Sequence, residues 1–238
     1  MRVTDMSARP TLAAKCSGAI VCLSAMALSS LIGILSITVS TLAYAGQFNH
    51  VLNVGDAAPA WNGLEGTDGK KHDYDELASA KFVIVAFTCN SCPYAVDVED
   101  RLIDLSRKAA QLGGALVAIN VNTIEADALP AMKDKAKTKR FDFTYLYDPT
   151  QEIAKAYGAK TTPEFYLLDA DRKVIYMGSL DDSPDGTKVK ERYLETAIGD
   201  LLSDAQPEVS ETVPIGCRIR FARTARTRSK ATQPSAKP

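Results

Sequence analysis

The pattern of apolar and polar positions separates the chain into an uncharged N-terminal stretch, an α/β body and a basic C-terminal end. Within the body, short continuous apolar runs alternate with segments whose apolar residues recur every three or four positions. The runs predict buried strands, and the periodic segments predict amphipathic helices. The predicted strands are residues 81–87, 115–120, 143–147, 164–169 and 173–178, and the predicted helices are residues 94–112, 130–140, 149–158 and 190–203.

Turn and cap residues support these boundaries. Gly113-Gly114 and Gly158 end two of the predicted helices, Pro130 suits the first turn of a third, and Asp68-Gly69 marks a tight turn. The last two strands are joined by three residues and predict a hairpin. The fold class is therefore α/β, with parallel strands first and an antiparallel hairpin at the end.

The first 45 residues are predicted to be an export signal. Arg2, Arg9 and Lys15 precede a stretch, Cys16–Gly55, that contains no Asp, Glu, Lys or Arg, and Ala43-Tyr44-Ala45 forms an A-x-A cleavage site. The apolar stretch could also span a bilayer at ~20 residues, so an uncleaved membrane anchor is the alternative. Basic residues ahead of the apolar segment favour export in both cases, to the periplasm or the exterior of the cell.

Charge is distributed unevenly along the chain, whose net charge is −1. Residues 1–45 carry +2 and residues 217–238 carry +7, so residues 46–216 carry −10. This acidic body argues against nucleic acid as a partner. We predict three parts: the signal or anchor (1–45), a folded domain (46–216) and a disordered basic tail (217–238), for which contact with anionic lipid or an acidic partner is the alternative.

Five cysteines occur, and Cys16 and Cys22 fall in the predicted signal. Cys89, Cys92 and Cys217 remain in the exported part. An odd number of cysteines outside the cytosol suggests a redox-active thiol rather than a closed set of structural bridges.

Cys89 and Cys92 stand three positions apart in "FTCNSCPY", between the predicted strand 81–87 and a helix beginning near Pro93. The first turn of a helix offers unpaired N–H groups and partial positive charge, which favour the nucleophilic thiolate. The two-residue spacing lets one sulfur attack a mixed disulfide formed on the other. The motif therefore favours thiol–disulfide exchange.

Two other functions of this pair are less well supported. A structural zinc site needs four ligands, and the body offers only Cys217, His50 and His72 besides the pair, without a second paired motif. A purely structural disulfide would close a very short loop and stabilise little. We expect neither a metal nor a cofactor.

The motifs "GDAAP", "FTCNSCPY" and "TTPEFYLLDADRKVIYMG" resemble the thioredoxin superfamily, nearest to redoxin-type proteins related to the alkyl hydroperoxide reductase and thiol-specific antioxidant group. The resemblance covers roughly residues 52–220. It implies a thioredoxin-like fold, a central mixed sheet flanked by helices. It also implies that Cys89 is the exposed nucleophile, that Cys92 is the more buried resolving cysteine, and that Thr162-Pro163 is a cis-proline site facing them and binding substrate. By itself, Pro163 is equally consistent with an ordinary proline at the start of a strand.

The sequence departs from the peroxiredoxin pattern at two points. Peroxidatic cysteines usually follow a threonine three positions earlier, whereas Cys89 occupies that position before Cys92 and the threonine is Thr88. An arginine usual near "TTPEFY" is also missing there. Both departures favour dithiol exchange.

Cys217 lies in an alternating segment with Ile215, Ile219 and Phe221, which predicts a short strand or an arm packed on the body. Two roles stay open for it. It is either a second resolving thiol within reach of Cys89 or Cys92, or a buried, inert cysteine.

The sequence thus predicts an exported thiol–disulfide oxidoreductase that acts through Cys89 and Cys92. A thiol peroxidase and a non-catalytic binding module that uses the groove beside Pro163 are the alternatives. The expected partners are protein or small-molecule disulfides, or a peroxide, together with an electron-donor protein.

Overall fold

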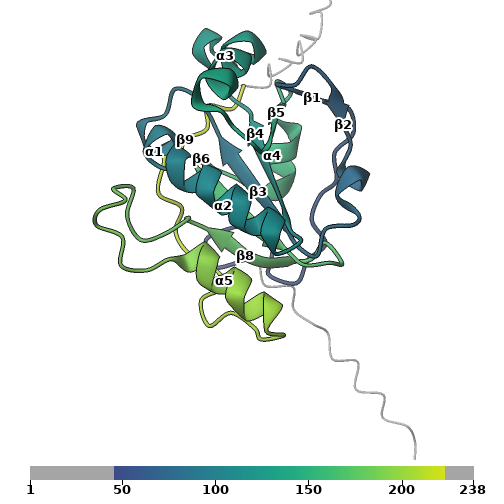
Figure 1. Ribbon diagram of the computed structural model, residues 1–238, viewed down its shortest axis with the longest axis vertical. Helices are drawn as coiled ribbons and strands as arrows, with labels where there is room; N and C mark the ends of the chain where they lie inside the picture. The colour runs from purple at the N-terminus through teal and green to yellow at the C-terminus, as the bar shows by residue number, and fades with distance from the viewer. Residues whose placement is uncertain (1–45, 223–238) are drawn as a thin grey trace, which may run out of the picture. The chain divides into compact units, whose positions relative to one another are not determined.

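The computed structural model describes residues 46–222, which form a mixed seven-stranded sheet with helices on both faces (Figure 1). The strand order is β2-β1-β5-β4-β3-β7-β8, and β6 and β9 form a separate two-stranded sheet. The strands are β1 (Leu64–Gly66), β2 (Lys71–His72), β3 (Val83–Thr88), β4 (Ala115–Asn120), β5 (Thr144–Tyr147), β6 (Thr161–Thr162), β7 (Glu164–Leu168), β8 (Val174–Gly178) and β9 (Cys217–Arg218). The helices are α1 (Pro93–Asp97), α2 (Glu99–Gln111), α3 (Leu129–Lys139), α4 (Glu152–Tyr157) and α5 (Tyr193–Leu202), with 3-10 turns η1 (Tyr74–Leu77) and η2 (Glu125–Asp127).

The pairing of the strands confirms the predicted topology. Strands β3, β4 and β5 run parallel to one another, whereas β7 is antiparallel to β3 and forms a hairpin with β8. All five predicted strands are present, with bounds that shift by at most two residues. The carboxyl end of β3 therefore lies between two neighbouring strands, β4 and β7. The residues that follow β3 have a strand on either side.

Strand β3 is apolar throughout because it is covered on both faces. Ile84 and Ala86 belong to the core under α2 and α5, which lie in front of the sheet in Figure 1. Val83, Val85 and Phe87 belong to the opposite core, which α4 and the segment before β1 cover. Truncating a buried side chain of this size typically lowers the free energy of unfolding by about 2–5 kcal/mol. The strand is therefore a rigid support for the residues that follow it.

Two local features differ from the sequence prediction. The helix predicted over residues 94–112 is two helices, which break at Val98 with φ −98° and ψ −4°. Helical spacing could not reveal this break, because Ala95, Val98 and Leu102 stay buried on both sides of it. The β1–β2 hairpin was not predicted as strands; its turn is the one predicted at Asp68-Gly69, where Gly69 has φ +82°.

The chain beyond α5 folds back onto the domain. Ile219 is buried, and its N–H donates to the Lys160 carbonyl at 2.9 Å. The folded part therefore continues past residue 216, where the sequence prediction placed the start of the tail, and reaches at least residue 222. The predicted signal or anchor (1–45) and the rest of the tail (223–238) lie outside the described residues.

Within residues 46–222, none of the helices combines the length and the hydrophobicity that a bilayer crossing requires.

Candidate active site

The cysteine pair occupies the end of β3, as predicted. Cys89 follows the last residue of β3, and Cys92 is the N-cap of α1, whose first residue is Pro93. Both sulfurs lie against one residue of β6: Cys89 Sγ is 3.3 Å from Thr162 Oγ1, and Cys92 Sγ is 3.1 Å from the Thr162 carbonyl oxygen. The Thr162–Pro163 peptide bond is cis. The structure therefore brings together all four residues that the sequence placed at the site.

The burial of the two cysteines differs from the expectation. The resemblance implied an exposed Cys89 and a more buried Cys92, but their exposed fractions are 2% and 4%. Both sulfurs are covered because β9 packs beside β6, the strand that both of them contact. Neither sulfur is open to a large substrate in this arrangement.

Asp127 holds the loop between the two cysteines. Its carboxylate accepts the N–H groups of Asn90 (2.6 Å) and Ser91 (3.0 Å) and the Ser91 hydroxyl (2.6 Å). Asp127 is fully buried in the segment after β4, and Asn122 donates a further bond to it at 3.2 Å. The loop conformation is therefore imposed by a charged acceptor on the neighbouring strand connection.

A second set of contacts holds the Asn90 side. Lys135 of α3 donates to the Asn90 carbonyl at 3.1 Å and pairs with the buried carboxylate of Glu99. The Tyr145 hydroxyl donates to Asn90 Oδ1 at 3.0 Å. Contacts from α3, β5 and the β4 connection thus converge on two residues of the motif.

Hydrogen bonding shifts the pKa values of the reduced pair in opposite directions, with that of Cys92 lowered. The Cys89 thiol donates to Cys92 and lowers its pKa to about 5; burial opposes this shift, and the Cys217 thiol, a second donor, supports it. The same hydrogen bond to Cys92, together with burial, raises the pKa of Cys89.

One contact acts on Cys92 in the opposite direction. The Thr162 carbonyl oxygen accepts a proton from this sulfur and so favours its thiol form. Two thiol donors act against this single acceptor, so the pKa of Cys92 is still lowered. Helix α1, with only five residues, contributes less to this than the sequence argument assumed, because a short helix has a small dipole.

Cys217 is the third sulfur at this site. It lies in β9, directly opposite Thr162 in the antiparallel β6–β9 pair, and it packs against Cys89, Cys92 and Ala95. Unlike the other two cysteines it is partly exposed. Burial raises its pKa to about 11, together with the hydrogen bond to Cys92. The sequence prediction of a short packed strand around Cys217 is confirmed.

Glu164, immediately after the cis-proline, supports the β6 segment. Its Oε2 accepts the N–H groups of Lys160 (2.8 Å) and Thr161 (3.0 Å), and Tyr166 donates to its Oε1 at 2.8 Å. Burial raises the pKa of this carboxyl group, against these hydrogen bonds. The position of Thr162 beside the sulfurs is thus set by a buried acid two residues further along.

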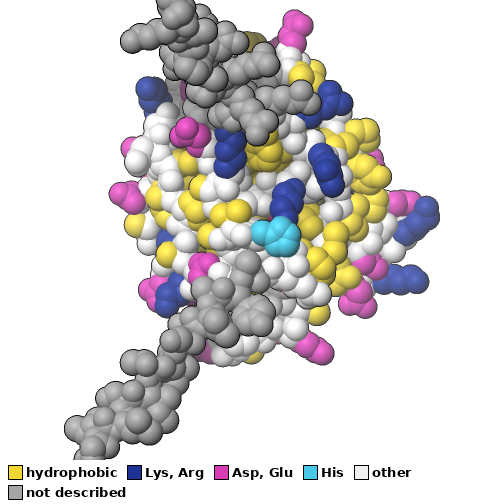
Figure 2. Space-filling model, turned by 180° about the vertical axis from the view of Figure 1, so that it is seen from behind, with side chains coloured by type: hydrophobic (Ala, Val, Ile, Leu, Met, Phe, Trp, Pro, Cys, Tyr) yellow, Lys and Arg dark blue, Asp and Glu magenta, His cyan; other side chains and the backbone are white. Residues whose placement is uncertain are grey.

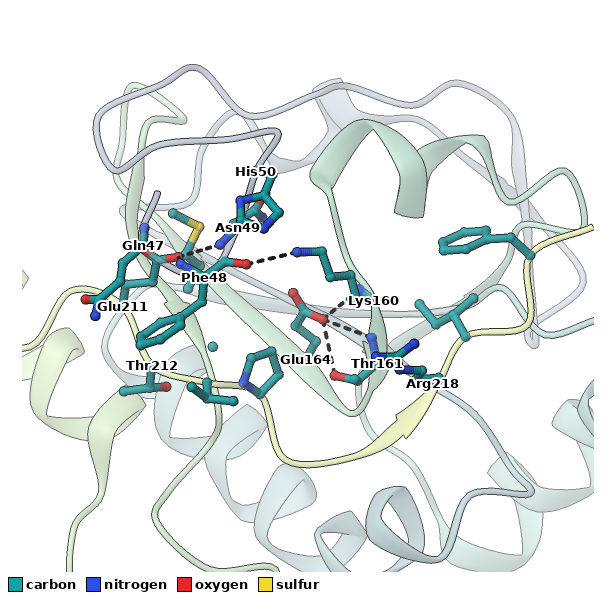
Figure 3. A pocket seen from close by; sticks show the side chains of 16 residues that line it. Gln47, Phe48, Asn49, His50, Lys160, Thr161, Glu164, Glu211, Thr212 and Arg218 are labelled. Carbon is teal, nitrogen blue, oxygen red and sulfur yellow. Dashed lines mark hydrogen bonds between the residues drawn. The ribbon is translucent and has the colours of Figure 1, made fainter. Parts of the chain in front are cut away.

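A pocket of about 630 Å³ lies behind the β6–β9 pair (Figure 3). Thr161 and Arg218 line it, whereas their neighbours Thr162 and Cys217 face the sulfurs, since adjacent residues of a strand point to opposite sides. Lys160 and His50 also line it. The view of the domain from behind in Figure 2 shows Lys and Arg side chains among apolar ones, with acidic side chains mostly towards the edge. This face is less acidic than the net charge of the body suggests.

Among the described residues, no group of three or more His, Cys, Asp and Glu side chains is arranged to hold a metal ion.

Sequence reasoning missed Asp127, Lys135 and Gly216 as residues of the site. A signal for Asp127 was present: it follows β4, the parallel neighbour of β3, and the carboxyl ends of parallel neighbours share one edge of a sheet. Gly216 and Lys135 carried no comparable signal, because their places depend on how distant segments pack.

The topology and the site define a thioredoxin-like fold. Residues 53–198, more than half of the chain, match the family model Redoxin, so the chain belongs to the redoxin family. It is therefore a redox protein with a thioredoxin-like fold.

The chain is also similar to solved structures. An uncharacterized conserved protein from Geobacillus kaustophilus is 34% identical, with 74% of this chain and 96% of that chain covered and a TM-score of 0.69. A hypothetical protein from Sinorhizobium meliloti 1021 is 30% identical, with 73% and 97% covered and a TM-score of 0.68. The peroxidoxin BcpB from Mycobacterium tuberculosis, 21% identical over 64% of this chain and 97% of its own with a TM-score of 0.52, shares the fold. No curated protein matches the chain in sequence.

Proposed function

We propose that this protein is an exported thiol–disulfide oxidoreductase that works through Cys89 and Cys92. The observation that carries the proposal is the contact of both sulfurs with Thr162, next to the cis-proline Pro163. The lowered pKa of Cys92 supports it. Two thiols that share one proton are prepared for exchange, because one is a nucleophile and the other is close enough to resolve the product.

The reaction proceeds in two balanced steps. The Cys92 thiolate attacks one sulfur of a substrate disulfide, forms a mixed disulfide and expels the other substrate sulfur as a thiolate. Cys89 then loses its proton, attacks the Cys92 sulfur and expels the second substrate thiolate. The substrate disulfide is reduced by two electrons and the cysteine pair is oxidised to a disulfide. The resemblance implied the opposite order, with Cys89 attacking first.

The proposed setting is outside the cytosol. The basic residues and the uncharged stretch before residue 55 support export, and the small apolar cleavage site supports release from the membrane. The proposed partners are protein or small-molecule disulfides and a separate electron-donor protein. N-terminal sequencing of the mature protein tests this: a start at Gly46 supports cleavage, and an intact N-terminus in a membrane fraction supports the anchor.

Catalysed reduction of a small-molecule disulfide such as glutathione disulfide, with a small dithiol as the electron source, tests the activity. The native protein should accelerate it, Cys92→Ser should abolish turnover, and Cys89→Ser should lower it. The matched control is Gly199→Ala, because a Cβ at this exposed position in α5 meets no atom within 4 Å. Full activity in either cysteine variant would overturn the proposal. Faster consumption of hydrogen peroxide than of disulfide would instead support the peroxidase, and binding without turnover would support the binding module.

A further inference from the structure

The segment that carries Cys217, which we name the C-terminal arm (residues 213–222), is anchored on the side before the cysteine. Ser179 Oγ donates to the Val213 carbonyl at 2.9 Å and accepts the Ile215 N–H at 3.0 Å. Just before the arm, Thr212 exchanges hydrogen bonds with Met177 and Ser179. The arm therefore leaves the domain from a fixed point next to β8.

The arm is also anchored after the cysteine. Gln151, a buried residue, donates to the Arg220 carbonyl at 3.1 Å and accepts the Ala222 N–H at 2.7 Å. Ile219 is 7% exposed and belongs to the core on the α4 side of the sheet. With attachments on both sides, Cys217 has a defined position over the cysteine pair.

Gly216 permits the close approach of the arm to β6. A Cβ at this position would lie 2.4 Å from the Thr162 carbonyl oxygen and 2.6 Å from the Thr162 carbonyl carbon. Backbone atoms cannot move aside as a flexible side chain does, so any other residue would displace the arm. The small residue before the cysteine thus brings Cys217 to the same carbonyl group that Cys92 contacts.

The three sulfurs form a sequence from the interior to the surface. Cys217 packs against the cluster that Cys89 and Cys92 form with Ala95, and both other thiols lower the pKa of Cys92. Cys89 and Cys92 are buried, and Cys217 is partly exposed. A bulky partner that approaches the folded domain therefore meets Cys217 before it meets either member of the pair.

We infer that Cys217 is a third exchange thiol, which accepts the disulfide from the buried pair and presents it at the surface to a dithiol electron donor. The inference rests on the proposed function, because the Cys89–Cys92 disulfide is its starting point. It makes the arm part of the site rather than a passive cover.

The transfer conserves bonds and electrons. The Cys217 thiolate attacks the Cys92 sulfur of the Cys89–Cys92 disulfide, a Cys92–Cys217 disulfide forms, and Cys89 leaves as a thiolate that takes up a proton. The donor dithiol then attacks the exposed Cys217 sulfur, expels Cys92 as a thiolate, and resolves its mixed disulfide with its second sulfur. The donor is oxidised by two electrons, and all three protein thiols are reduced again.

Charge explains why Cys217 stays inactive until the pair is oxidised. In the reduced site the Cys92 thiolate repels a second negative charge on Cys217. Oxidation of the pair removes that charge, so Cys217 ionises more readily when its target disulfide exists.

Mass mapping of disulfides in variants that each lack one of the three cysteines tests the transfer. Cys89→Ser, oxidised with glutathione disulfide, should form a Cys92–Cys217 bridge, and Cys217→Ser should form only the Cys89–Cys92 bridge. If Cys89→Ser forms no Cys92–Cys217 bridge while Cys217→Ser still forms its bridge, the relay is overturned and the proposed function stands. If Cys217→Ser forms no Cys89–Cys92 bridge, the proposed function itself fails.

Turnover separates a relay from a passive lid. With a protein dithiol as the donor, a relay predicts that Cys217→Ser lowers turnover at least about tenfold, because an intramolecular step is lost. Gly216→Val, which keeps all three cysteines but displaces the arm, should lower turnover to a similar extent, and Gly199→Ala should not. Unchanged or faster turnover in Cys217→Ser and Gly216→Val would overturn the relay and identify the arm as a lid.

Discussion

Two cysteine-bearing segments meet at Thr162, and they are built in different ways. The loop Cys89–Cys92 is held by the elements on either side of it and by Asp127, Lys135 and Tyr145 of the neighbouring layers. The arm is held by Ser179 and Gln151, which are 34 to 71 residues away in sequence from their partners in it.

The difference lies in the motif and not in the contacts, because the loop is also held by residues 36 to 55 positions away in sequence. The pair carries a recognisable motif, since its chemistry requires two sulfurs at short spacing. The arm requires only a short strand with a glycine and a cysteine that reaches Thr162. A glycine followed by a cysteine occurs in many other structural settings, so it does not indicate a site by itself.

Replacement of the central sulfur should have the largest effect. Cys92→Ser removes the sulfur with which both Cys89 and Cys217 exchange, so we expect disulfide reduction to fall by at least about a thousandfold. Cys217→Ser should lower it much less, because the pair remains. Steady-state rates with one disulfide substrate measure both. An equal loss in the two variants would mean that the arm and the pair do not differ in this way.

Loss of the acceptor beneath the loop should destabilise the domain. Asp127→Ala leaves the Asn90 and Ser91 N–H groups without their acceptor, and we expect the free energy of unfolding to fall by about 2–4 kcal/mol. Asp142→Ala is the matched control, since Asp142 pairs with Arg107 on the exposed surface, where such pairs contribute less than about 1 kcal/mol. Denaturant unfolding compares them. A loss in Asp127→Ala no larger than in the control would show that the loop does not depend on this acid.

Removal of the arm's distal anchor should loosen the arm and leave the pair unchanged. Gln151→Ala removes the two bonds to Arg220 and Ala222 as well as one to Val121, and it should raise the alkylation rate of Cys217 by about tenfold. Formation of the Cys89–Cys92 disulfide should still occur. Gln111→Ala, at the exposed end of α2, serves as the control. Equal alkylation rates in the native protein and Gln151→Ala would show that the arm is held elsewhere.

The smallest effect concerns protonation. With a Cys92 pKa of about 5, the ultraviolet absorbance of the thiolate in the reduced protein should appear as the pH rises through 5 and be nearly complete by neutral pH. Cys217→Ala removes one donor to this sulfur, so the midpoint should move upward, but it should remain below the ordinary thiol range because Cys89 still donates. A midpoint that is unchanged in Cys217→Ala would show that Cys217 does not donate to the Cys92 sulfur.

The sequence by itself determined the order of the elements, the mixed sheet and the position of the cysteine pair at the end of β3. Those features follow from local patterns: the apolar period, the turn residues and the spacing of a motif. It also brought Thr162 and Pro163 into consideration, through the resemblance of their segment to a family.

The tertiary structure alone decided three things. It buried both sulfurs of the pair, it lowered the pKa of Cys92, and it laid the arm across β6 so that Cys217 joins them. The physical reason is that burial and hydrogen bonding depend on which distant segments share a surface. Residues such as Asp127, Gln151 and Gly216 act through single contacts across the fold, and no periodic pattern along the chain records such contacts.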